Sequence, residues 1–98
     1  MAMIGSFGDE ATADLFHGRQ TGRVRRIPQD LHRRTLVKLD VLNAADRLVD
    51  LSSPPGNRLE ALKGDWAGFH SIRVSRQWRL VFQWRDSNVY EVQLIDYH

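Results

Sequence analysis

Hydrophobic and polar residues alternate with a period of two through much of the second half of the chain, which is the pattern of half-buried β-strands. The clearest strand covers residues 78–85, where one face carries Trp78, Leu80, Phe82 and Trp84 and the other carries Arg79, Val81, Gln83 and Arg85. Residues 68–74 and 88–95 also alternate, the latter with Tyr90, Val92 and Leu94 on one face, and residues 58–62 alternate weakly. Short connections at 75–77 and 86–88 predict tight turns and therefore an antiparallel sheet. The aromatic stripe is expected to be core rather than a base-stacking platform.

The first half of the chain has the longer period of helices. A helix is predicted over 9–17 with Asp9 as its N-cap, and a second over about 28–45 with Pro28 at its first position. Residues 4–7 predict a short strand, 18–26 a loop, and the Pro-containing run 52–57 a break in regular structure. Together these elements predict one domain over residues 1–98. Its fold class is α+β, with N-terminal helices packed on a small antiparallel sheet.

Composition narrows the class of protein. Hydrophobic residues make up 42% of the 98 residues, which is typical of a globular chain. No apolar run approaches about 18 residues, and the first residues lack the pattern of a signal peptide. The chain has no Cys, which excludes disulfides and thiolate metal sites, and no His or carboxylate cluster has metal-ligand spacing. We expect a cytoplasmic protein with no membrane association, no metal and no cofactor.

Arginine dominates the basic residues, since only Lys38 and Lys63 of the fourteen are Lys. Six Arg lie between Arg19 and Arg34 against a single acid, among them Arg23, Arg25 and Arg26. Arginine suits bidentate phosphate contacts and stacking on bases. One interpretation of this block is a solvated basic loop followed by a helix face. The other, which we favour, is a surface for nucleic acid or for an acidic partner.

The sequence ends in Asp96-Tyr97-His98, directly after the predicted last strand. A strand within a sheet holds its end still, so these three residues are able to carry chemistry. His has the unperturbed pKa nearest neutrality and is suited to moving protons. The alternative is a solvated tail, because chain ends are usually polar and frayed.

Four ordered motifs resemble those of the HigB toxins, a branch of the RelE superfamily. They are Ser53-Pro54-Pro55-Gly56-Asn57-Arg58-Leu59-Glu60-Ala61-Leu62-Lys63-Gly64-Asp65, Gly68-Phe69-His70-Ser71-Ile72-Arg73-Val74, Gln77-Trp78-Arg79-Leu80-Val81-Phe82 and Asp96-Tyr97-His98. The resemblance covers essentially the whole chain from Met3 and implies a RelE-like fold. It implies the toxin of a type II toxin–antitoxin pair, a ribosome-dependent endoribonuclease that cuts mRNA in the ribosomal A site and inhibits translation. The implied partners are the ribosome, mRNA and a HigA-type helix-turn-helix antitoxin. The toxin is expected to contact operator DNA only through this antitoxin.

By this resemblance the catalytic residues are Lys63, Arg79, Asp96, Tyr97 and His98. Metal-independent RNA cleavage needs a base for the ribose 2′-OH, an acid for the departing 5′ oxygen and cations at the phosphate. His98 is the best proton-transfer candidate, and Asp96 is able to take a proton or to orient a neighbouring ring. Tyr97 is expected to act as a base only with help, or to stack or donate a hydrogen bond. Lys63 and Arg79 are the phosphate candidates, with Arg73 a weaker candidate for RNA binding.

Structural alternatives stand beside these roles. Lys63 precedes Gly64 and fits an ordinary turn, Arg79 fits a cross-strand ion pair, and His70 is expected to pack near the sheet rather than to catalyse. Glu60 stands where some family members carry His, which leaves the division of acid and base roles open. Two other functions also stay open: a basic RNA- or ribosome-binding module without catalysis, and a protein-binding partner of a DNA-binding repressor.

Overall fold

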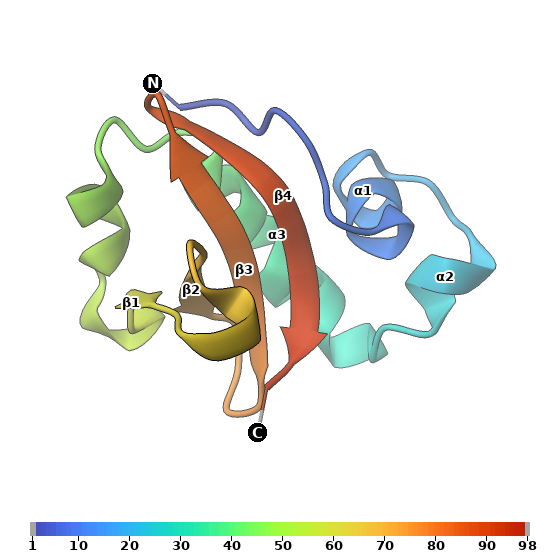
Figure 1. Cartoon of the computed structure of the whole chain (residues 1–98). Coiled ribbons are helices and arrows are strands. Elements are labelled where there is room, and N and C mark those ends of the chain that lie inside the picture. Colours follow the sequence, from blue (N-terminus) through green and yellow to red (C-terminus); the bar gives the residue numbers. More distant parts are fainter. Residues whose placement is uncertain (1, 98) are drawn as a thin grey trace.

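A four-stranded antiparallel sheet in the order β1-β2-β3-β4 is the centre of the computed structural model, which describes residues 2–97 (Figure 1). The strands are β1 (Glu60–Ala61), β2 (His70–Arg73), β3 (Trp78–Arg85) and β4 (Asn88–Asp96). The predicted alternation over 78–85 and 88–95 therefore marks the two long strands correctly. The weak alternation over 58–62 corresponds to a strand of only two residues at the sheet edge.

Three α-helices precede the sheet in sequence: α1 (Glu10–Phe16), α2 (Gly22–Arg25) and α3 (His32–Leu42). Short 3₁₀ turns are η1 (Gln29–Leu31), η2 (Leu48–Ser52), η3 (Pro55–Asn57) and η4 (Gly64–Trp66). Asp9 caps α1 as predicted, because its carboxylate accepts a hydrogen bond from Thr12 N at 3.0 Å. No helix among residues 2–97 is long and apolar enough to cross a membrane.

The predictions for residues 18–45 need two corrections. Part of the expected loop 18–26 is the helix α2, which Thr21 caps by accepting from Val24 N at 3.2 Å and which buries Val24 in the core. The expected helix 28–45 is shorter and begins as the 3₁₀ turn η1, so Pro28 lies before α3 rather than at its first position. The sequence around α2 has only a weak helical pattern. The helix forms because the tertiary fold buries Val24.

The outer edge of β4 is covered by the N-terminal segment. Ile4 and Phe7 form isolated parallel bridges with Val89 and Val92, so the predicted strand 4–7 is reduced to two bridges. Gly5 N donates to Val89 O at 2.7 Å, and Gly8 N donates to Val92 O at 2.8 Å. An edge covered in this way offers few free backbone groups for pairing with another chain.

A β-bulge in β4 changes which side chains face the core. The pairing with β3 shifts between Val81 and Gln83, and Glu91 has a φ of 54°. The extra residue reverses the alternation, so Val89 and Val92 are both buried, and Tyr90 lies opposite Gln83 on the other face. The prediction that Tyr90 shares a face with Val92 is therefore wrong.

The core lies between α3 and one face of the sheet, with α1 beside β4 (Figure 1). Leu39 and Leu42 of α3 and Leu80 and Phe82 of β3 are fully buried in one cluster. Trp78 and Trp84 are partly buried against the same cluster, which confirms the prediction that the aromatic stripe of β3 is core. The opposite face of the sheet, here called the outer face, is thereby left to polar side chains such as Arg79.

Candidate catalytic site

Arg79 is held on the outer face by groups from three different segments. Its Nη1 lies 2.8 Å from Glu60 Oε1 and donates to Ser71 Oγ at 2.9 Å and to the Arg58 carbonyl at 3.4 Å. Glu60 belongs to β1, Ser71 to β2 and Arg79 to β3, so the register of the sheet brings them together. All three contacts use Nη1. The Nε and Nη2 fork, which suits bidentate phosphate binding, takes no part in them.

Tyr97 lies against the same guanidinium. The Arg79 Cζ atom is 5.0 Å from the centre of the Tyr97 ring, which is a cation–π distance. Strand pairing explains the contact: Ile95 lies opposite Arg79, and Tyr97 follows two residues later on the same face. The Tyr97 backbone is fixed by its N–H, which donates to the Gln77 carbonyl at 2.5 Å. Tyr97 is 41% exposed.

Asp96 does not join this group. It pairs with Trp78 in the ladder, on the face opposite Arg79 and Tyr97, and it accepts a hydrogen bond from Gln77 Nε2 at 3.1 Å. The structure therefore separates two residues that are adjacent in the predicted catalytic set. His98, the strongest proton-transfer candidate from the sequence, lies outside the described residues.

Two further predicted residues, Arg73 and Lys63, make no hydrogen bond or ion pair with this group within residues 2–97. Arg73 is the ladder partner of Arg79, so both cations stand on the outer face, and Arg73 Nε donates to the Ser75 carbonyl at 3.1 Å. Lys63 is exposed just before η4, two residues after β1. Within residues 2–97 its side chain makes no hydrogen bond or ion pair.

Glu60 and Ser71 are the site residues that the sequence reasoning missed. In the sequence, Glu60 stands out only as a departure from the family pattern, and Ser71 does not stand out as a candidate. The available signal was the register of two hairpins: Glu60 pairs with Ser71, and Ser71 is a diagonal neighbour of Arg79. The interpretation of Arg79 as an ion-paired residue is correct in geometry, and the ion pair is part of the site.

The arginines around α2 differ from one another. Arg23 Nη2 lies 3.1 Å from Asp14 Oδ2 and its Nη1 lies 3.2 Å from Glu10 Oε2, whereas Arg25 and Arg26 are exposed. Burial raises the pKa of Asp14, but hydrogen bonds from Thr21, Arg19 and Arg23 outweigh it and hold that pKa below its ordinary value. The Arg23 guanidinium is thus held in an ion pair with the buried carboxylate of Asp14.

His70 packs against the core ring of Phe82, with the ring centres 6.2 Å apart. Its Nδ1 is buried and has no hydrogen-bond partner within residues 2–97. The expectation that His70 packs near the sheet is confirmed. In the same described part of the chain, no three His, Asp or Glu side chains gather as a potential metal site.

Residues 6–98 match the family model described as the RelE-like toxin of the type II toxin–antitoxin system HigB. Toxin HigB-1 of Vibrio cholerae is 48% identical over 64 residues, which cover 65% of this chain and 67% of that protein. Endoribonuclease HigB of Proteus vulgaris is 30% identical over 96 residues, which cover 98% of this chain and all of that protein.

Solved structures show the same fold at low sequence identity. YafQ from E. coli aligns with a TM-score of 0.56 and 16% identity, covering 98% of this chain and 93% of YafQ. A chain of the heterotetrameric YoeB–YefM toxin–antitoxin complex from Staphylococcus aureus aligns with a TM-score of 0.54 and 18% identity, covering 100% of this chain and 98% of that chain. The predicted α+β, RelE-like fold is confirmed.

Proposed function

Since this chain belongs to the HigB-like family of toxins from type II toxin–antitoxin systems, we propose that it is a ribosome-dependent endoribonuclease that cleaves mRNA in the A site and inhibits translation. The name Endoribonuclease HigB, borne by the relative that aligns over nearly the whole chain, supports the reaction type. The observation that carries the proposal is the Arg79 group on the outer face, because it presents a positioned cation beside an exposed phenol.

The scissile phosphate is the ligand that this group fits best. Contacts to Glu60 and Ser71 fix Arg79 through Nη1, and the Nε and Nη2 fork, which makes none of the Arg79 contacts found within residues 2–97, matches two phosphate oxygens. Arg73, opposite in the ladder, adds positive charge to the same face. Cations positioned in advance stabilise the charge that develops on phosphorus oxygens in the transition state. Lys63 is the second phosphate candidate. It is exposed and follows β1 by two residues in the sequence.

Proton transfer completes the reaction without a metal. A base removes the proton of the ribose 2′-OH as its oxygen attacks phosphorus, and an acid protonates the 5′ oxygen as the P–O5′ bond breaks. His98 is assigned the main transfer role from its place in the sequence motif. Tyr97 stacks beside the reacting nucleotide or donates a hydrogen bond to it. Asp96, held by Gln77 on the other face, acts indirectly by orienting the end of the strand.

The ribosome and an antitoxin are the proposed macromolecular partners. A small open face offers few contacts to position single-stranded RNA, so the ribosomal A site supplies the orientation that speeds the reaction. The family membership and the toxin–antitoxin complexes among the structural relatives support an antitoxin partner. We propose a HigA-type antitoxin with a helix-turn-helix domain, which binds operator DNA while the toxin does not.

The test is mRNA cleavage in a translating extract, read as new 5′ ends. We expect Arg79→Ala to slow cleavage by at least about 10²-fold, the usual effect of removing one transition-state donor, and Arg79→Lys to recover part of the rate. His98→Ala is expected to abolish cleavage. The matched control is Arg85→Ala, because Arg85 is an exposed cation at the other end of β3.

Circular dichroism checks that each variant is folded. Wild-type cleavage by folded Arg79→Ala and His98→Ala proteins would refute the catalytic assignment. Inhibition of translation without any new mRNA 5′ ends would instead favour the non-catalytic ribosome-binding module.

A further inference from the structure

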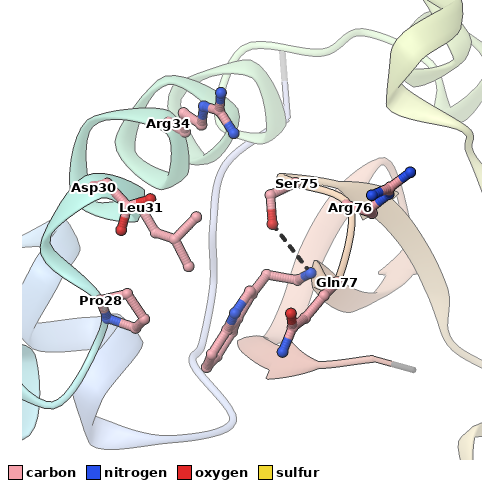
Figure 2. A pocket seen from close by; sticks show the side chains of 8 residues that line it. Pro28, Asp30, Leu31, Arg34, Ser75, Arg76 and Gln77 are labelled. Carbon is pink, nitrogen blue, oxygen red and sulfur yellow. Dashed lines mark hydrogen bonds between the residues drawn. The ribbon is translucent and has the colours of Figure 1, made fainter.

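A groove runs between the start of α3 and the turn that joins β2 to β3. It consists of two adjoining pockets of about 450 Å³ and about 310 Å³, both lined by Arg34. Figure 2 shows the larger pocket, with Pro28, Leu31 and Arg34 on the helical wall and Ser75, Arg76 and Gln77 on the turn. The smaller pocket continues along α3, where it is lined by Arg33, Val37, Lys38 and Val74. We call the two pockets together the α3 groove.

The α3 groove carries several cations that form no ion pair with another residue of the described range 2–97. Arg33, Arg34 and Arg76 are exposed, and within residues 2–97 none of them forms an ion pair. Lys38 adds a fourth cation, with its Nζ hydrogen-bonded to the neutral amide oxygen of Asn57. By contrast, Arg19, Arg23, Arg47 and Arg79 all pair with carboxylates. Among the described residues that line the groove, Asp30 is the single acid, so the positive charges there exceed the negative ones.

The same groove has an apolar strip. Val37, in the middle of α3, is 52% exposed, although the other apolar residues of that helix are buried or partly buried. Leu31 and Val74, which are buried in the core, line its floor, and Trp78 extends the floor toward β3. The exposed Val37 thus lines the same pocket as Arg33, Arg34 and Lys38, above an apolar floor, which matches a ligand that has both aliphatic and acidic side chains.

We propose that the α3 groove is the docking site for an acidic, amphipathic segment of the antitoxin. Aliphatic side chains of that segment cover Val37 and the groove floor, and its carboxylates pair with Arg33, Arg34 and Arg76. The occupant is a protein rather than RNA, because Val37 and the apolar floor formed by Leu31 and Val74 suit aliphatic side chains, which a phosphate backbone does not supply. The inference rests on the proposed toxin function. It adds a binding surface distinct from the outer face that holds Arg79.

The experiment measures binding of the purified antitoxin encoded by the adjacent reading frame, and of a fluorescein-labelled poly-uridine RNA, to the full-length toxin. The variants are Arg34→Glu, which reverses one unpaired charge, and Val37→Ser, which removes only apolar contact. Arg85→Glu is the matched control, since Arg85 is exposed and lies at the opposite end of β3 from Trp78. Both groove positions are exposed, and melting curves check that the variants are folded.

We expect Arg34→Glu and Val37→Ser each to weaken antitoxin binding by about tenfold or more, with Arg85→Glu close to wild type. We also expect Val37→Ser to bind poly-uridine and to cleave mRNA as wild type does. Antitoxin binding within twofold of wild type for both groove variants would overturn the proposal. So would a loss confined to poly-uridine binding, which would make the groove an RNA surface. If wild-type toxin neither inhibits translation nor binds the antitoxin, the proposed function itself fails, which is a different result from failure of the groove variants alone.

Discussion

Arg79 is a charged residue in a largely buried position, since only 13% of its side chain is exposed. A charge in such a place must be paired and hydrogen-bonded to be tolerated. Glu60 supplies the countercharge, and Ser71 and the Arg58 carbonyl supply acceptors. The carboxylate that holds the guanidinium therefore also stands beside any phosphate that the guanidinium binds.

This geometry makes Glu60 a further proton-transfer candidate beside those that the sequence offers. We predict that Glu60→Gln slows single-turnover cleavage on saturating ribosomes by about 10²-fold, because an amide keeps the contact to Arg79 but cannot accept a proton. Glu91→Gln is the control, since Glu91 is an exposed carboxylate in β4. If Glu60→Gln cleaves at the wild-type rate, Glu60 transfers no proton and only positions Arg79.

Asp14 is a buried carboxylate whose charged form stabilises the fold. It is buried and accepts hydrogen bonds from Arg19, Thr21 and Arg23, which keep its pKa below the ordinary value of 3.8. Its charged form therefore stabilises the folded state above pH 3.8, and this contribution is lost as the pH falls below 3.8 toward the folded-state pKa.

We predict that Asp14→Asn lowers the urea midpoint of unfolding at neutral pH. We also predict that it shrinks the drop in midpoint between about pH 5 and about pH 2, because the asparagine has no proton to gain. Asp40→Asn, an exposed change on α3, should alter neither quantity appreciably. An acid dependence in Asp14→Asn as steep as in wild type would mean that other carboxylates control acid unfolding.

At the scale of elements, β4 connects the sheet, the N-terminal segment and the candidate site. One edge pairs with β3, the other is covered by residues 4–8, and its end places Tyr97 beside Arg79. The bulge at Glu91 turns Tyr90 out of the core and over the N-terminal segment, where Gly5 faces the phenol ring. A Cβ atom on Gly5 would lie 2.5 Å from Tyr90 Cε1, which is closer than packed atoms allow.

Gly5→Ala is therefore predicted to destabilise the protein by about 1–3 kcal/mol, the usual cost of forcing an extra methyl group into a packed contact. Gly22→Ala is the matched control, because a Cβ there meets nothing within 4 Å. The measurement is the free energy of unfolding from urea titrations. Equal stability of the two variants would show that the Tyr90 ring moves aside without cost.

At the scale of the whole molecule, the cations divide into separate groups. Arg73 and Arg79 lie on the outer face, Arg33, Arg34 and Arg76 line the α3 groove, and Arg25 and Arg26 are exposed on and after α2. Arg23 differs from its neighbours because it is bound to Asp14 and Glu10. The long-range field of the exposed groups attracts polyanions and weakens with salt.

We predict that the double variant Arg25→Gln/Arg26→Gln associates with ribosomes more weakly than wild type at low salt and converges with it at high salt. The rate of single-turnover cleavage at saturating ribosome should stay at the wild-type value, because long-range charge acts on encounter rather than on bond breaking. Arg23→Gln is the contrast and should chiefly lower stability, since it removes a partner of Asp14. Ribosome binding equal to wild type at every salt concentration would make Arg25 and Arg26 a solvated surface only.

The amino-acid sequence by itself determined the features that depend on local periodicity and on motif order. Alternation marked β3 and β4, Asp9 marked the start of α1, and the aromatic stripe of β3 marked the core. The four motifs identified the family, which the matching family model confirms. These features were readable because a strand or helix period and a capping side chain act over a few neighbouring residues.

Only the tertiary structure decided which distant side chains meet. The contact of Glu60 with Arg79 depends on the register of two hairpins, and the separation of Asp96 from Tyr97 depends on which face each residue takes in the ladder. The ion pair between Arg23 and Asp14 depends on how α2 packs beside α1. A shift of one residue in a strand reverses every side chain after it, as the bulge at Glu91 shows. Contacts of this kind follow from the path of the whole chain, which no short window of sequence contains.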